Sequence, residues 1–194
     1  LGFKNGLQQD TRLGIFPAPV HPELPVWLTC TNDPHMFVRA GQLGVNIITA
    51  LLAQTMDEAA ERIALYRQAL LDNNHDPASK TVTMMLHTFV LDDNEMAIEM
   101  AREPFCNYIK SHLGLISNVI DNFNVNDVDL NDEDHLDGLA NAAYERYLQS
   151  GSLIGSPQTC QVMMTKMADI GVDEIACLID FGVSAEQVLQ SLDL

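Results

Sequence analysis

The stretch TVTMMLHTFV, residues 81–90, decides the fold class, and the stretch EIACLIDFG, residues 174–182, repeats its character. Both are short, apolar and rich in β-branched residues, which is typical of strands buried on both faces in a parallel sheet. Both end in polar side chains, His87 and Thr88 in the first and Asp180 in the second. The sequence therefore predicts two buried strands whose carboxyl ends carry groups able to do chemistry.

Helices alternate with strands along the rest of the chain. Two more strands are predicted, VWLTC at 26–30 and VNIIT at 45–49, and helices are expected at 34–43, 56–74, 92–109, 135–149, 157–170 and 185–192. This alternation indicates a parallel sheet covered on both faces. No strand is followed by G-x-G-x-x-G or a P-loop lysine, so the nucleotide-binding classes lack their signature. The remaining large class is the (β/α)8 barrel, with its site at the carboxyl ends of the strands. Four predicted strands make half of such a barrel and leave two open edges.

Composition narrows the class of function. A chain of 194 residues with 47% hydrophobic residues predicts one domain with one core, spanning 1–194. The net charge of −17 argues against nucleic acid and anionic membrane surfaces as partners. No apolar run approaches the ~18 residues of a membrane span, and no signal-peptide pattern opens the chain, so we expect a cytoplasmic location. Four widely spaced cysteines without C-x-x-C predict neither disulfides nor a metal site.

Local signals fix several helix ends. Thr55 and Glu58 form the pattern of a capping box, and Ser156 followed by Pro157 predicts the start of another helix. We expect Pro104 to break or restart the helix predicted at 92–109. Residues 1–25 contain four prolines and no period, which indicates an irregular lead-in.

The segment 111–152 is the irregular part of the chain. It contains the acidic run DNFNVNDVDLNDEDHLDG, which has no Lys or Arg. Asp127, Asp129 and Asn131 match the first ligand positions of an EF-hand loop, but Asp132 replaces its glycine and Gly138 its bidentate glutamate. A calcium loop is therefore excluded, and we expect a solvated, mobile insertion here.

Several stretches resemble the bacterial luciferase-like flavin-dependent monooxygenases: PAPVHPELPVWLT, AGQLGVNIITALLAQ, ERIALYRQAL, VTMMLHTFV, and GSPQTC with GVDEIACLIDFG. The similarity is greatest to the subgroup associated with nonribosomal peptide and polyketide synthases. The resemblance implies a (β/α)8 barrel of which this chain supplies the C-terminal half, about strands five to eight. The segment 111–152 falls between strand seven and its helix, where relatives carry a flavin-covering lid.

The resemblance also implies a cofactor and partners. Reduced FMN would bind at the carboxyl ends of the strands and react with O2 to oxygenate an organic substrate. The substrate would be a natural-product biosynthetic intermediate, either a small molecule or one bound to a carrier protein, and a separate reductase would supply the reduced flavin. We expect the chain to act as a homo-oligomer or together with a missing N-terminal half, and to be inactive alone.

Site residues follow from the same resemblance. In relatives the turn after strand five, here TNDPHM at 31–36, binds the flavin phosphate, while Thr29, Cys30 and Thr31 would line the flavin edge. Asn32 and Met36 stand where relatives tend to have glycine and threonine. The cofactor-binding candidates are thus Thr29, Cys30, Thr31, Asn32 and Met36.

Two residues are catalytic candidates, and each has a structural alternative. His87 either contacts flavin or substrate or is a hydrogen-bonded core histidine. Asp180 either serves the site or links strand eight to a neighbouring loop. The alternatives for the whole chain are a deazaflavin-dependent oxidoreductase of the same fold and a non-catalytic half-barrel remnant or scaffold.

Overall fold

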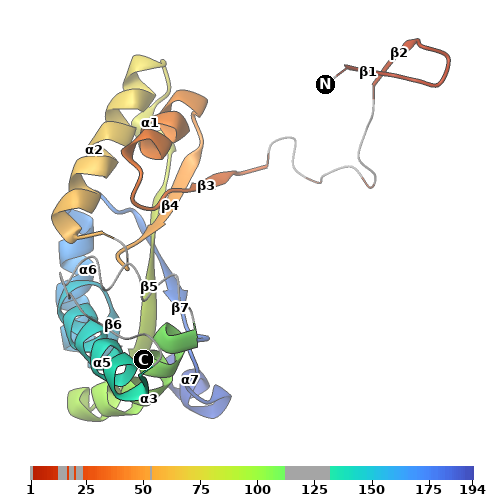
Figure 1. Ribbon diagram of the computed structural model, residues 1–194. Helices are drawn as coiled ribbons and strands as arrows, with labels where there is room; N and C mark the ends of the chain where they lie inside the picture. The colour runs from red at the N-terminus through yellow and green to blue at the C-terminus, as the bar shows by residue number, and fades with distance from the viewer. Residues whose placement is uncertain (1, 13–16, 18–19, 21–23, 53, 112–131) are drawn as a thin grey trace.

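The computed structural model describes the chain except residues 1, 13–16, 18–19, 21–23, 53 and 112–131, and its centre is a parallel sheet (Figure 1). Strands β3 (Trp27–Thr29), β4 (Asn46–Ala50) and β5 (Val82–Val90) lie side by side in this order. Strand β7 (Glu174–Leu178) pairs with β5 from Thr83 to His87, and β6 (Leu153–Gly155) pairs with the end of β5 from Thr88 to Val90. All of these pairings are parallel, which confirms the predicted α/β fold with a partial barrel.

The helices follow the predicted order. They are α1 (Pro34–Leu43), α2 (Met56–Asp72), α3 (Asn94–Ser111), α5 (Glu133–Ser150), α6 (Pro157–Asp169) and α7 (Ala185–Ser191), with a 3-10 turn η1 (Pro77–Ser79). Helices α1, α2 and α6 lie on one side of the sheet in Figure 1, and none of the described helices covers the opposite side of β3, β4 and the first part of β5. Among the described helices, none is long and apolar enough to cross a bilayer.

The predicted caps position these helices. The Thr55 hydroxyl accepts the Glu58 N–H at 3.2 Å, and the Glu58 carboxylate accepts the Thr55 N–H at 2.8 Å, so the capping box is complete. Ser156 caps α6, with Pro157 in its first turn. Helix α1 ends at Gly44, whose φ of 65° is in the left-handed region that favours glycine.

The larger core lies between the sheet and the helices α1, α2 and α6. One side-chain row of β5 (Val82, Met84 and Leu86) points into it, and helix residues such as Phe37 and Met167 cover that row. Because side chains alternate along a strand, the other row, with Thr83, Met85 and His87, must point to the opposite face.

The opposite face is concave, as a hydrogen-bonded chain across it shows. Trp27 on β3 reaches past β4, so that its Nε1–H donates to Thr83 Oγ1 on β5 at 2.9 Å. The Thr83 hydroxyl donates in turn to Glu174 Oε1 on β7 at 3.2 Å. A side chain can span two strands in this way because the sheet curves towards that face. We call this side of β3, β4, the first part of β5 and β7 the open face.

A second core lies at the carboxyl end of β5. Helices α3 and α5 pack together there and bury Phe89 of the strand with Phe105, Tyr144 and Tyr147. Tyr144 Oη donates to the Ile98 carbonyl and so ties α5 to α3. The sheet is therefore backed by helices on one face along most of its length and is covered on the other face only at its carboxyl end.

The structure corrects several local predictions. The lead-in at 1–25 contains an antiparallel hairpin of β1 (Gly2–Lys4) and β2 (Asp10–Arg12), because a tight turn with Asn5 accepting backbone N–H groups outweighs the lack of apolar period. The short strand β6 was not predicted, since three residues are too few to show a period. Pro104 does not break α3, because the buried residues Phe105, Cys106 and Ile109 hold the last turns in the core. Strand β7 ends at Leu178, before Asp180.

The helix predicted at 135–149, in the second part of the segment 111–152, is present as α5. It begins at Glu133, where Asp132 caps it, and it contributes buried residues to the second core. The acidic residues at the helix start are favoured by the helix dipole. Residues 112–131, with the rest of the expected lid, lie outside the described residues.

Candidate functional site

The candidate site lies at the carboxyl ends of β3, β4, β5 and β7, where a parallel barrel keeps its chemistry. The strands deliver Thr29, Ala50, His87 and Leu178 to this end. Asp180 follows β7 directly, and the turn into α1 follows β3. The predicted site residues are therefore at one end of the sheet, but they do not have the same environment.

His87 is enclosed by aromatic rings. It is 1% exposed, and its ring lies 5.0–5.4 Å from four others at steep interplanar angles of 67–81°. The four rings are those of Phe105 and Tyr108 on α3, Tyr147 on α5, and Phe181 after β7. Edge-to-face packing of this kind is favourable, because ring edges are positive and faces are negative. We call His87 and these four residues the His87 cluster.

The hydrogen bonds of His87 come from Tyr147. The Tyr147 hydroxyl lies 3.2 Å from His87 Nδ1 and 3.5 Å from the His87 backbone nitrogen, so it can accept the backbone N–H and donate its own proton to the ring. Burial lowers the pKa of His87 to about 4, although the Asp180 carboxylate acts in the opposite direction. At neutral pH the imidazole is therefore uncharged. A ligand can reach it only if the surrounding rings move.

Asp180 is the exposed member of this neighbourhood. Its side chain is in solvent, and its charge raises the pKa of the Tyr108 hydroxyl in addition to the larger effect of burial. The structure thus brings the two catalytic candidates into electrostatic contact, with Asp180 at the surface and His87 below it. Their catalytic roles remain predictions.

The turn between β3 and α1 carries most of the cofactor-binding candidates. Thr31, Asn32 and Met36 are exposed there, and the Thr31 hydroxyl donates to Asn32 Oδ1 at 3.3 Å. Asp33 caps the helix, since its Oδ1 accepts the His35 N–H at 2.9 Å. The N-terminus of α1 would otherwise attract an anion, but a carboxylate already occupies it.

The two candidates at the end of β3 face opposite sides of the sheet. Thr29 shares the open face with Trp27 and is exposed. Cys30 is buried against the helices, with its thiol 3.6 Å from the Leu28 carbonyl, and burial raises its pKa to about 11. Strand alternation therefore leaves Thr29 able to meet a ligand with its side chain, whereas Cys30 offers the open face only its backbone.

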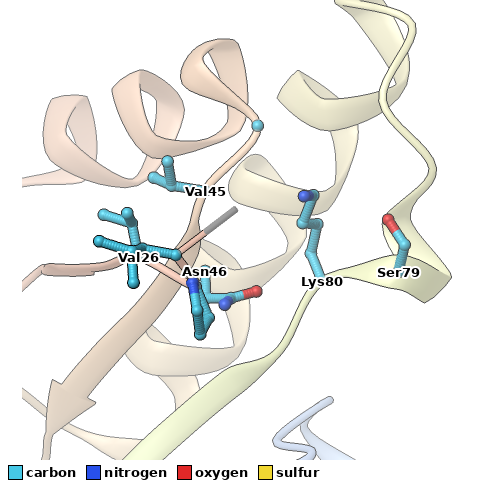
Figure 2. A pocket seen from close by; sticks show the side chains of 8 residues that line it. Val26, Val45, Asn46, Ser79 and Lys80 are labelled. Atoms are coloured by element: carbon cyan, nitrogen blue, oxygen red, sulfur yellow. The ribbon is translucent and has the colours of Figure 1, made fainter. Parts of the chain in front are cut away.

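A hollow lies at the other end of the sheet. It has a volume of about 600 Å3 and adjoins the amino ends of β3, β4 and β5, where Figure 2 shows Val26, Asn46 and Lys80. Asn46 is already engaged there, since its Oδ1 accepts the Thr81 N–H at 2.9 Å. We do not place the site in this hollow, because the loops that carry chemistry in a parallel barrel lie at the carboxyl ends of the strands. Within the described part of the chain, no three His, Cys, Asp or Glu residues are grouped so as to hold a metal ion.

The model of one protein family, luciferase-like monooxygenase, matches residues 5–174. The chain belongs to this family. A search of curated protein sequences gave no match. The family assignment agrees with the parallel sheet, the open face and the location of the candidate residues at the carboxyl ends of the strands.

Solved structures of the luciferase-like fold are similar to the whole chain. Monooxygenase RslO1 from Streptomyces bottropensis matches with a TM-score of 0.69 at 12% identity, over 100% of this chain and 53% of its own. The oxygenating constituent of 3,6-diketocamphane monooxygenase from Pseudomonas putida, solved with FMN, matches with a TM-score of 0.64 at 16% identity, over 100% of this chain and 56% of its own. An F420-dependent tetrahydromethanopterin reductase from Methanopyrus kandleri gives 0.63 at 13% identity, over 87% of this chain and 49% of its own. The chain spans about half the length of these structures.

Sequence reasoning missed most of the His87 cluster in this luciferase-like chain. The sequence predicts helices that contain Phe105, Tyr108 and Tyr147, but it does not predict which side of each helix faces His87. A usable signal existed, since Tyr144 and Tyr147 are three residues apart on one helix face. That signal predicts an aromatic face but not the histidine that it meets.

Proposed function

We propose that the chain forms the carboxyl-terminal half of a reduced-FMN- and O2-dependent monooxygenase acting on a natural-product biosynthetic intermediate. The observation that carries the proposal is the match of residues 5–174 to the luciferase-like monooxygenase model, on a sheet whose carboxyl end bears the candidate residues. The similarity in fold to an FMN-bound oxygenating protein supports it. We further propose that a separate reductase supplies the reduced flavin.

The residues present fit a flavin ring better than a flavin phosphate. The open face near the carboxyl ends offers Thr29 together with partly exposed apolar groups such as Met85 and Leu178, which suit a flat, largely apolar ring. The phosphate turn is less suitable, because Asp33 occupies the N-terminus of α1 and would repel a dianion. Thr31, Asn32 and the N–H groups of this turn remain as donors.

The bound flavin would supply the oxygen-activating chemistry, and this chain's residues would bind and shield it. Thr29 and Thr31 offer hydroxyls to the ring edge and the phosphate turn. The aromatic rings of the His87 cluster exclude water from the end of β5, and water exclusion protects reactive intermediates in such sites. At neutral pH His87 is an uncharged imidazole that keeps its one ring N–H and does not readily accept a second proton.

A second candidate function is a deazaflavin-dependent oxidoreductase. Its support is the similarity in fold to two F420-dependent proteins, a secondary alcohol dehydrogenase with a TM-score of 0.60 and the reductase described above. The two functions differ in their need for O2, because a hydride transfer to or from the deazaflavin consumes none. The third alternative, a non-catalytic scaffold, would bind neither cofactor.

The first experiment compares FMN with riboflavin, which lacks the phosphate. Binding is measured by flavin fluorescence for the wild-type chain and for Asp33→Ser, which keeps a helix cap but removes the charge. We expect Asp33→Ser to bind FMN about five-fold more tightly, equivalent to about 1 kcal/mol for one charge at the protein surface. Riboflavin affinity should not change. Glu61→Ser, on the exposed side of α2, is the matched control.

The second experiment measures O2 consumption with reduced FMN, with F420 and with neither. Flavin-dependent consumption, alone or after addition of a complementary half-barrel, supports the monooxygenase. Turnover of reduced F420 without O2 consumption supports the oxidoreductase instead. Absence of binding to either cofactor in the completed barrel would overturn both.

A further inference from the structure

A pocket of about 240 Å3 lies between the last turn of α5 and one side of α6. The lining residues of α6 are spaced by three or four positions, so they form a single face of that helix. The pocket shares no residue with the candidate site described above. Its lining consists of Leu148 and Gln149 on α5, Ser152 before β6, and Thr159, Val162, Met163 and Lys166 on α6.

Ser152 is the buried polar residue of this lining. It is 4% exposed, and its hydroxyl has no hydrogen-bond partner among the described residues. Two neighbouring hydroxyls are engaged, since Ser150 donates to the Arg146 carbonyl at 2.9 Å and Thr159 donates to Asn94 Oδ1 at 2.7 Å. A buried hydroxyl without a partner is unfavourable, so a ligand group that bonds it gains from doing so.

Lys166 brings a positive charge to the same pocket. It is exposed and forms no ion pair with any described residue, although the chain has 27 acidic and only 10 basic residues. Helical side chains lean towards the amino end of their helix, so Lys166 reaches back towards Met163. Met163 packs in the same core as Leu153, which follows Ser152. Among the described residues that line the pocket, none is Asp or Glu, so the lining favours an anion.

We infer that this pocket binds a short aliphatic monocarboxylate. The carboxylate accepts hydrogen bonds from the Lys166 ammonium and the Ser152 hydroxyl. The alkyl chain packs against Leu148, Val162 and Met163, and it covers Val162, which is 59% exposed without it. One ammonium group balances one negative charge, so a monoanion fits better than a phosphate dianion on a chain with a net charge of −17.

The probe is butanoate, and the signal is the methyl resonance of Met163 in a chain labelled with 13C at its methionine methyl groups. Met163→Leu assigns this resonance. We expect a saturable shift with a Kd of about 1 mM, because so small a ligand makes few contacts. The resonance of Met84, which is buried under the sheet's other helices, should not move. Butanamide lacks the charge and inorganic phosphate lacks the alkyl chain, so each should bind about ten-fold more weakly.

Two variants separate the hydroxyl from the charge. Ser152→Ala and Lys166→Gln should each weaken butanoate binding about ten-fold. Lys80→Gln is the matched control and should bind normally, because Lys80 also lacks an ion-pair partner among the described residues but lies at the amino end of β5. Without ligand, Ser152→Ala should not lower the urea midpoint, because the hydroxyl that it removes has no partner.

Three results would overturn the inference: no saturable shift of the Met163 resonance, butanoate binding that both variants leave unchanged, or equal binding of butanamide. A ligand-free Ser152→Ala chain that is clearly less stable than wild type would do the same, since the hydroxyl would then be bonded within the chain. Lys166 is exposed, so Lys166→Gln tests binding in a chain that keeps its core. No flavin is present, and the failure of this inference leaves the proposed function untouched.

Discussion

The two ends of β5 present the same face of the same strand to very different surroundings. At Thr83 the side chain is buried by a chain of hydrogen bonds alone, between Trp27 and Glu174, which are both exposed. At His87, four residues on, the side chain is enclosed by four rings from this chain's own helices and loop. The described residues therefore complete the packing of this face at the carboxyl end of the sheet and leave Trp27 and Glu174 exposed towards its amino end.

The largest effect is expected from removing the ring that holds the closed end together. Phe105 is fully buried and contacts His87, Tyr144, Tyr147 and Phe181. Phe105→Ala should lower the free energy of unfolding by about 3–5 kcal/mol, because it leaves a cavity in the second core. Urea denaturation measures the loss. Met96→Ala, at an exposed position of the same helix, should stay within about 0.5 kcal/mol of wild type.

The second largest effect is expected in the pH dependence of the free energy of unfolding, to which His87 at the carboxyl end of β5 contributes. The pKa of His87 in the folded chain is about 4, below the ordinary 6.5, so the folded state favours the neutral ring. Its stabilising contribution is complete above pH 6.5 and is lost as the pH falls from 6.5 to 4, by up to about 3 kcal/mol. Asp180, Tyr108 and Tyr147 face the ring, and Asp180 opposes the effect.

The measurement is a series of urea midpoints between pH 7 and pH 4. The chain has many carboxylates that also titrate in this range, so the quantity of interest is the difference between wild type and His87→Leu. That difference should change with pH in the stated direction. A difference that is flat from pH 7 to pH 4 would show that His87 is accessible to protons in the folded chain.

Deleting one hydrogen bond at the closed end should have a smaller effect. Tyr147→Phe removes the hydroxyl that lies 3.2 Å from His87 Nδ1 but keeps the ring. We expect a loss of about 1–1.5 kcal/mol, because the buried nitrogen is left without this partner. In a double-mutant cycle with His87→Leu, most of the loss should disappear. Additive effects would contradict the pairing.

The smallest effect is expected from the matching deletion at the open end. Trp27→Phe removes the Nε1–H that donates to the buried Thr83 hydroxyl, from a ring that is itself partly exposed. We expect a loss of about 0.5 kcal/mol, since the Thr83 hydroxyl keeps its hydrogen bond to Glu174. A loss equal to that of Tyr147→Phe, measured in the same urea series, would contradict this difference between the two ends of β5.

Much of the fold could be predicted because its signals are local. The capping box of Thr55 and Glu58 and the Ser156–Pro157 start each depend on a few adjacent residues, and both occur as predicted. The apolar, β-branched run at 81–90 could be recognised as a buried strand because the strand, Val82–Val90, is long enough for its composition to show. Strand β6 and the first hairpin could not, because three-residue strands carry no measurable period.

The candidate site could be predicted only as a location. Parallel strands place their carboxyl ends together, so the sequence could indicate that Thr29, His87 and Asp180 lie at one end of the sheet. It could not indicate that Cys30 points into the helical core, because a shift of one residue in strand register reverses every side chain. Nor could it indicate that His87 is covered, since its hydrogen-bond partner is 60 residues away on another helix.

The sequence by itself determined the alternation of strands and helices, the helix caps and the side chains that the strand ends carry, because each follows from backbone preferences over a few residues. The tertiary structure decided which face of the sheet the helices leave uncovered and which rings enclose His87. It also decided that hydrogen bonds connect Trp27 to Thr83 and Thr83 to Glu174. These features arise from contacts between strands and helices far apart in the chain, and their geometry depends on the curvature of the sheet and on how the helices pack against it.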